Sequence, residues 1–329
     1  MTRSGASQGD GVRPGTLTRR SLSAAACILV ASSFLCLGQD PGDPLAFARK
    51  QLGKLRFDRA MVEVDRVLET DPRNLQAWRL RGEIALAQGD LDEALDSWTI
   101  ASQLVPDDPE LLVRIGDLLT RKSDRLDDAL TAYGKALTID PANTRVMISV
   151  GSIHERRQQW AEAAASYEAA LAVDPNLLRA RSSLGAVKFK MGDYPGASAA
   201  LTKAIELSPN DLRSRVFFGL SQNHLGHYDV AIRELKEAVL IDPHAANQLI
   251  GLRGQHGQFM HLIEVFTAPY EANPREAGRS YDLAVIHFFA RNYEESWKFL
   301  MKAEQLRYPV PMTFKEVVYS KRRLQSTKS

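Results

Sequence analysis

The chain has 329 residues, of which 44% are hydrophobic and 25% charged, a composition typical of folded proteins. Its formal net charge is +2, and because residues 1–38 contribute +3, the rest of the chain is close to neutral at −1. A near-neutral body argues against a nucleic-acid partner, which needs a concentrated basic surface. Both cysteines, Cys27 and Cys36, lie in residues 1–38, which excludes disulfide, zinc-thiolate and cysteine-nucleophile chemistry from the remainder.

The N-terminus has the charge and hydropathy pattern of an export signal. The basic stretch GTLTRR precedes an uncharged, mostly apolar run over residues 21–38, and the polar stretch QDPGDP follows. Cys36 and Gly38 place small residues at the −3 and −1 positions of a cleavage site after Gly38. Because the run is at the lower length limit for a spanning helix, an uncleaved anchor is the alternative. We therefore expect residues 1–38 to be a signal peptide or an N-terminal inner-membrane anchor, placing the body in a periplasmic or other extracytoplasmic space.

After a short linker at residues 39–43, the sequence repeats itself with a period of about 34 residues. Glycines and alanines keep the same interval as the prolines. The prolines are Pro72, Pro106, Pro141, Pro175, Pro209, Pro243 and Pro274. The glycines are Gly82, Gly116, Gly151, Gly185 and Gly219. A period of this length indicates one supersecondary unit that is stacked many times.

The pattern resembles the tetratricopeptide repeat, whose signature is W-x2-L-G-x2-Y, then A-x3-F, then P. The second unit carries it as Trp78, Gly82, Gly89, Ala94, Trp98, Ala101 and Pro106. The resemblance covers about residues 44–310 in eight units. It implies an all-α fold, an α-solenoid in which antiparallel helix pairs stack into a right-handed superhelix. Residues 311–329 then form a C-terminal capping helix with a basic tail.

The residues of one unit have physical roles in a helix pair. Ala163, Tyr167 and Ala170 are spaced as one face of the second helix of the fourth unit. Gly151 on the preceding helix and Ala163 permit the two helices to approach closely, so a larger side chain there would overpack the contact. Glycines at the ends of first helices, such as Gly89, Gly192 and Gly226, suit the left-handed conformation that caps a helix.

The seventh unit departs from the pattern. It is three residues shorter, lacks the pair of small residues and carries Pro269 where its second helix is expected. We predict an irregular unit and a bend or hinge at this place.

No catalytic, cofactor-binding or metal-binding motif accompanies the repeats. The sequence has no Walker loop, G-x-S-x-G or H-E-x-x-H motif. His224 and His227 are three residues apart, but no third ligand is evident beside them. We therefore predict a protein that is not an enzyme and uses no cofactor.

The resemblance places the second residue of each unit on the inner face of the solenoid, where this family usually binds a peptide or helix. In the fourth to sixth units this residue is Arg145, Arg179 and Arg213, a set we call the arginine ladder. Arg156 and Lys190 lie near the other end of the same helices. A basic strip of this kind favours an acidic segment or a C-terminal carboxylate, since arginine binds carboxylates in a bidentate manner. The alternative is that these charges only solvate the surface.

A second candidate surface is apolar and lies nearer the C-terminus. Tyr281, Val285 and Phe288 are spaced i, i+4 and i+7 on one predicted helix, and Val216 and Leu220 are similarly placed two units earlier. If they face inward they form an apolar floor for an amphipathic helix, and if not they pack the core.

The sequence thus predicts a scaffold or adaptor that binds a segment of another protein in the groove of the solenoid. The alternative function is a structural, self-associating component of an envelope assembly. Neither function involves nucleic acid, and contact with a membrane is expected only through residues 1–38.

Overall fold

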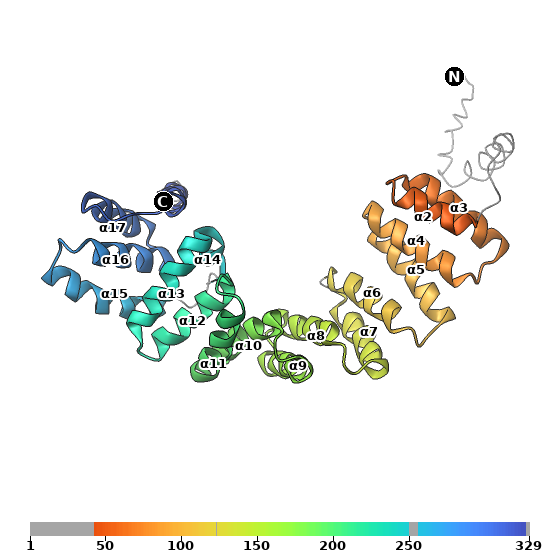
Figure 1. The fold of residues 1–329 in the computed structure, drawn as a ribbon, viewed down its shortest axis with the longest axis horizontal. Helices are drawn as coiled ribbons and strands as arrows, with labels where there is room; N and C mark the ends of the chain where they lie inside the picture. The colour runs from red at the N-terminus through yellow and green to blue at the C-terminus, as the bar shows by residue number, and fades with distance from the viewer. Residues whose placement is uncertain (1–42, 123, 250–255, 327–329) are drawn as a thin grey trace, which may run out of the picture. The chain divides into compact units, whose positions relative to one another are not determined.

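A computed structural model of the chain describes residues 43–122, 124–249 and 256–326, and within these ranges it contains helices and turns but no strand (Figure 1). The all-α prediction is confirmed. The predicted signal or anchor at residues 1–38 lies outside the described residues. The chain divides into two compact units, Met1–Ala94 and Leu95–Ser329, and each is described by itself.

The helices follow one another in pairs joined by short turns, with the first helix of each pair carrying an even label. The first compact unit contains α2 (Pro44–Leu52), α3 (Phe57–Thr70) and α4 (Leu75–Gln88). Helix α5 (Leu91–Leu104) begins in the first unit and continues into the second. The second unit continues with α6 (Pro109–Thr120), α7 (Leu126–Ile139), α8 (Thr144–Arg156), α9 (Trp160–Val173), α10 (Leu178–Met191), α11 (Tyr194–Leu207), α12 (Leu212–His224) and α13 (Tyr228–Ile241). It ends with α14 (Pro243–Leu249), α15 (His256–Ala272), α16 (Ala277–Phe289), α17 (Tyr293–Gln305) and α18 (Met312–Ser326).

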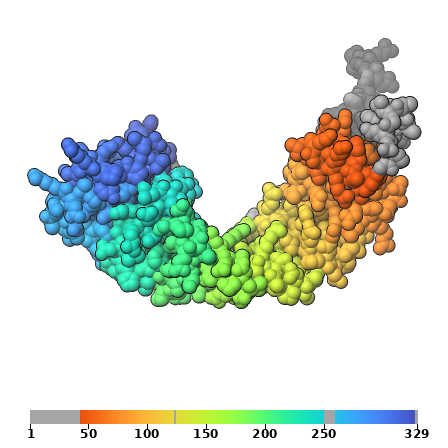
Figure 2. Space-filling model, viewed as in Figure 1, coloured from red at the N-terminus to blue at the C-terminus, as the bar shows by residue number. Residues whose placement is uncertain are grey.

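Within the second compact unit, each helix pair packs on the next pair along the chain. Helix α9 contacts α10, and α11 contacts α12, so the second helix of one pair joins the first helix of the following pair. In Figure 2 the colours of residues 95–249 accordingly follow one another in chain order along the surface. Neighbouring pairs therefore bury the apolar faces that a single pair leaves exposed.

Inside a pair, a glycine of the first helix faces a large side chain of the second. A Cβ atom added at Gly116 would lie 2.5 Å from the ring of Tyr133, and one at Gly151 would lie 2.7 Å from the ring of Tyr167. Both tyrosines are almost completely buried. The predicted close approach at Gly151 is confirmed, and the side chain that fills the space there is Tyr167.

Six of the described turns between paired helices share one left-handed backbone conformation at the same position of the repeat. Gly89, Gly192 and Gly226 have φ angles of 85°, 82° and 80°, which confirms the predicted left-handed caps. Other units hold a larger residue in the same left-handed region, and these are Leu55, Gln158 and Arg291 with φ of 56°, 59° and 62°. The repeat therefore imposes the backbone conformation even where no glycine is present.

The seventh pair, which the sequence predicts to be irregular, is described only in part, because residues 250–255 lie outside the described residues. Its first helix, α14, is described over 7 residues, and α13 contacts α16 of the eighth pair directly. The Lys236 ammonium on α13 donates to the Asp282 carboxylate on α16 at 2.8 Å. Helix α15 continues through Pro269, so the proline does not end the second helix at that point.

The C-terminal helices close the second compact unit with an aromatic core. Phe288 on α16 and Phe314 on α18 are fully buried, and their ring centroids lie 5.0 Å apart. Val318 of α18 is buried in the same cluster. Helix α18 therefore covers the apolar face of the last pair.

Within residues 43–122, 124–249 and 256–326, none of the helices combines the length and the apolar character that crossing a bilayer requires.

The contact between Gly151 and Tyr167 is tested by Gly151→Ala. The added methyl group would displace the Tyr167 ring, so we expect the free energy of unfolding to fall by about 1–3 kcal/mol. Chemical denaturation followed by circular dichroism measures this change.

Gly134→Ala is the matched control, because Gly134 lies in helix α7 and a Cβ atom there would meet no heavy atom within 4 Å. This substitution should raise the free energy of unfolding by up to about 1 kcal/mol, since alanine is the better helix former. Equal effects of the two substitutions would contradict the packing role of Gly151.

Candidate functional site

The candidate site is the face formed by the first helices α8, α10 and α12, all in the second compact unit. The arginine ladder occupies the second residue of each helix, with Arg145 on α8, Arg179 on α10 and Arg213 on α12. Arg145 and Arg179 are exposed, and Arg213 is partly buried. The contacts between α8 and α10 and between α10 and α12 place these helices side by side.

Two members of the ladder have carboxylate partners within the chain. Arg145 donates to Asp117 on α6. Arg213 donates to Oε1 of Glu155 on α8 at 2.5 Å, two repeats earlier in the sequence. Arg179 makes no hydrogen bond or ion pair with any other described residue. Arg179 is therefore the ladder position where an external carboxylate meets no internal competitor.

The two internal carboxylates are themselves held by the buried tyrosines. The Tyr133 hydroxyl donates to Oδ1 of Asp117 at 2.7 Å, and the Tyr167 hydroxyl donates to Oε2 of Glu155 at 3.1 Å. Burial, with the neighbouring carboxylate adding to it, raises the pKa of Tyr133, so its hydroxyl remains a donor at neutral pH. Tyr133 and Tyr167, which pack their helix pairs, thus also position the two carboxylates that pair with arginines of the ladder.

Two aromatic rings lie close to the cations of this face. The Lys190 ammonium lies 6.0 Å from the ring centroid of Phe189 and 5.8 Å from that of Phe217, and the Arg213 guanidinium lies 5.9 Å from the latter ring. Desolvation in this environment lowers the pKa of Lys190, against the opposing effect of Glu155. Both rings are buried, so the cations of this face lie over the core and the rings add little exposed apolar surface.

Arg156 lies at the opposite end of α8 from the ladder. Its side chain is exposed and donates to the backbone carbonyl of Thr120 at 2.8 Å. Together the five cations of this face meet two carboxylates, Asp117 and Glu155, so the face keeps a net positive charge.

Sequence reasoning missed Glu155, Phe189 and Phe217. A usable signal exists for the first two, because Glu155 and Phe189 are 34 residues apart and occupy the same position of successive repeats. That position neighbours Arg156 and Lys190, which the sequence singles out.

The predicted apolar floor does not form an exposed surface. Its five members are buried in the C-terminal core cluster, so the alternative interpretation, core packing, accounts for them. These residues are Val216, Leu220, Tyr281, Val285 and Phe288. The Tyr281 ring stacks on Tyr308 with centroids 4.7 Å apart, and Phe288 packs against Phe314. Helix α18 and the displaced seventh pair cover a face that a regular stack would leave open.

The two histidines considered as metal ligands have other contacts. The His224 ring stacks on Tyr194 at a centroid distance of 4.0 Å, and Nδ1 of His227 shares a hydrogen bond with Gln222 at 2.6 Å. Within the described ranges no three His, Cys, Asp or Glu side chains come close enough to hold a metal ion.

Comparisons with known proteins agree with the helical repeat fold. Residues 64–176 match the model of the cytochrome c-type biogenesis protein H TPR domain. Residues 156–238 match the model of the anaphase-promoting complex, cyclosome, subunit 3. The chain carries tetratricopeptide repeats. The matched ranges include the tetratricopeptide repeats that bear the arginine ladder.

The relatives share only part of their length with this chain. It is 31% identical over 98 residues to the BBSome complex member BBS4 of Bos taurus, covering 30% of this chain and 18% of that protein. It is 31% identical over 103 residues to the protein O-mannosyl-transferase TMTC1 of Mus musculus, covering 30% and 11%. A tetratricopeptide repeat protein from Parabacteroides merdae matches with a TM-score of 0.50 at 19% identity, over 76% of this chain and 98% of that one. That likeness shows the fold alone.

A double-mutant cycle tests the internal partner of the ladder. We expect Glu155→Gln and Arg213→Gln to show a coupling of about 1 kcal/mol in the free energy of unfolding, because both side chains are about two-thirds buried. The matched pair Asp117→Asn and Arg145→Gln should couple by only a few tenths of a kcal/mol, since Arg145 is 70% exposed. Equal couplings in the two cycles would contradict the assignment of Glu155 as a structural partner.

Proposed function

We propose that this protein is a non-enzymatic adaptor that binds an acidic segment of another protein on the face of α8, α10 and α12. The observation that carries the proposal is Arg179, an exposed arginine without a carboxylate partner in the described chain, between two arginines one repeat away. Proteins built of tetratricopeptide repeats are generally interaction scaffolds rather than enzymes.

The physical basis is that one arginine of the ladder, Arg179, has no carboxylate partner within the described chain. A carboxylate of the partner would receive a charge-assisted, bidentate contact from Arg179. Lys190 and Arg213 would attract the flanking acids over the rings of Phe189 and Phe217. Because the repeat spacing separates the ladder positions, the ligand would lie extended along the stack and bring one acid to each tetratricopeptide repeat.

We further propose that residues 1–38 export the protein or tether it to a membrane. The support is the basic, apolar and polar order of that segment.

Fractionation of cells that express the full chain, beside a variant lacking residues 2–38, tests this location. The full chain should be recovered outside the cytoplasm or with membranes, and the shortened variant in the cytoplasm. Recovery of both in the cytoplasm would contradict the proposed location.

A structural, self-associating role is the second candidate, and a row of exposed apolar residues favours it. These residues lie at or directly after the ends of successive second helices, at one position of the repeat. They are Val105, Ile139, Val173, Leu207 and Ile241, exposed by 37–48%. Such a row would suit contact with another copy of the chain.

Affinity capture after cross-linking, with the full chain as bait, tests the adaptor. Arg179→Glu should weaken the captured partner's binding at least tenfold, because an attractive contact becomes a repulsive one. The dissociation constant of the partner's acidic segment measures the change.

Lys203→Glu is the matched control, because Lys203 is an exposed cation without a carboxylate partner in the described chain and lies on the second helix α11. It should leave the affinity unchanged. Capture of the bait alone, with a mass that rises with concentration, would favour self-association and contradict the adaptor.

A further inference from the structure

A cluster of exposed cations surrounds the turn between α2 and α3 in the first compact unit. Five basic residues lie within eleven positions, and none has a carboxylate partner in the described parts of the chain. They are Arg49, Lys50, Lys54, Arg56 and Arg59. The only acid among residues 44–60 is Asp58, so this segment carries a local net charge of +4. We call it the basic turn.

An apolar side chain projects from the middle of the basic turn. Leu55 is 74% exposed, more than the other exposed large apolar residues of the described chain. Its φ angle of 56° lies in the left-handed region, which costs a leucine about 1 kcal/mol. Gly89 and Gly192 occupy this repeat position in other pairs. The first pair therefore presents an exposed leucine at a site where glycine would be more favourable for folding.

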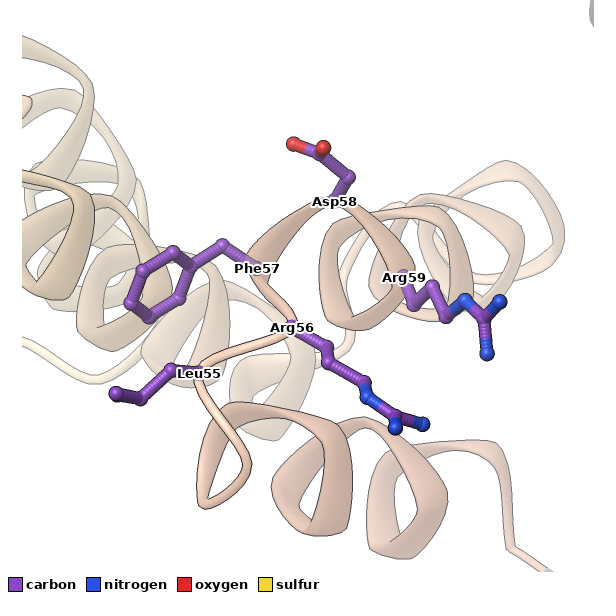
Figure 3. Close-up of a pocket in the computed structure, with 5 residues that line it drawn as sticks. All are labelled: Leu55, Arg56, Phe57, Asp58 and Arg59. Atoms are coloured by element: carbon purple, nitrogen blue, oxygen red, sulfur yellow. The ribbon is translucent and has the colours of Figure 1, made fainter.

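The apolar and the basic side chains of the basic turn lie on different sides of it. Figure 3 shows Leu55 and Phe57 on one side of the turn, Arg56 and Arg59 extended to the other, and Asp58 directed away from both arginines. These five residues line a depression in the surface. The arrangement is amphipathic at the scale of a single turn.

This chemistry matches a membrane surface better than a dissolved polyanion. Anionic headgroups attract lysine and arginine near the bilayer, and an apolar side chain among them can enter the acyl boundary. An acidic peptide or a nucleic acid would satisfy the cations but would leave Leu55 in water. Charge complementarity and the exposed leucine together select the lipid surface.

If residues 1–38 tether the protein to a membrane, as proposed above, they would hold the turn near that membrane. The apolar run ends at Gly38 and α2 begins at Pro44, so the intervening linker of residues 39–43 can span about 18 Å when extended. The 9 residues of α2 add about 14 Å before the turn. If the apolar run of residues 21–38 were inserted in a bilayer, it would therefore hold the basic turn within reach of the lipid headgroups.

We propose that the basic turn, with Leu55 at its tip, binds the anionic lipid headgroups of a membrane surface. This contact uses a different compact unit and a different ligand from the proposed adaptor face. It supplies a second attachment beside residues 1–38, since stable anchoring generally needs two signals.

Vesicle co-sedimentation of the full chain tests the proposal, with neutral phosphatidylcholine vesicles beside vesicles containing phosphatidylglycerol. The difference between the two gives the charge-dependent part of binding, to which residues 1–38 also contribute through their net charge of +3, and the variants below assign the share of the basic turn. Each cation near the surface contributes about fivefold in partitioning, and reversal adds repulsion, so the triple variant Lys54→Glu, Arg56→Glu, Arg59→Glu should lose at least about 100-fold on anionic vesicles. Its binding to neutral vesicles should not change.

The matched control reverses three exposed cations without described carboxylate partners in the second compact unit, Arg121→Glu, Lys135→Glu and Lys203→Glu. It has the same net charge as the first variant and should retain most of the binding to anionic vesicles. Equal losses in the two triple variants, or no loss in the first, would overturn the proposal. Circular dichroism verifies that each variant is folded.

Leu55→Asn separates the lipid surface from other polyanions, because asparagine tolerates the left-handed backbone but is not apolar. It should lower partitioning on anionic vesicles about tenfold and leave binding to immobilised heparin unchanged. An unchanged vesicle affinity would show that the basic turn is only a site for polyanions, and the lipid proposal would fail.

Discussion

The contact between a glycine of one helix and a buried tyrosine of the next organises the middle of this protein. At Gly116 with Tyr133, and at Gly151 with Tyr167, the absence of a Cβ atom lets the ring lie against the backbone of the first helix. The ring is buried while its hydroxyl reaches a carboxylate on that helix. One side chain therefore both closes the pair and fixes an acid at its surface.

The candidate binding face depends on this arrangement. The acids held by the tyrosines, Asp117 and Glu155, pair with Arg145 and Arg213 of later helices. These ion pairs restrict the side chains they join, and Arg179 between them keeps its donors available to a ligand. A packing contact inside each pair thus determines which cation of the ladder is open.

Repetition explains why much of the fold could be predicted. A residue type that returns every 34 positions indicates a contact that returns in every pair, so the helices and the left-handed glycine caps follow from the sequence. The partner of Arg213 could not be predicted in this way, because Glu155 lies 58 positions earlier and has no equivalent at every repeat. Burial of Phe288 likewise depends on α18 and the irregular seventh pair, whose positions have no periodic signal.

Photo-cross-linking tests the central claim, that the partner lies on the face of α8, α10 and α12. A photoreactive residue would replace either Arg156 on α8 or Lys203 on α11, both of which are exposed. After irradiation of cells of the source organism, we expect a covalent adduct with the partner from position 156 and none from position 203. An adduct from position 203 alone would place the partner on the second helices and contradict the account.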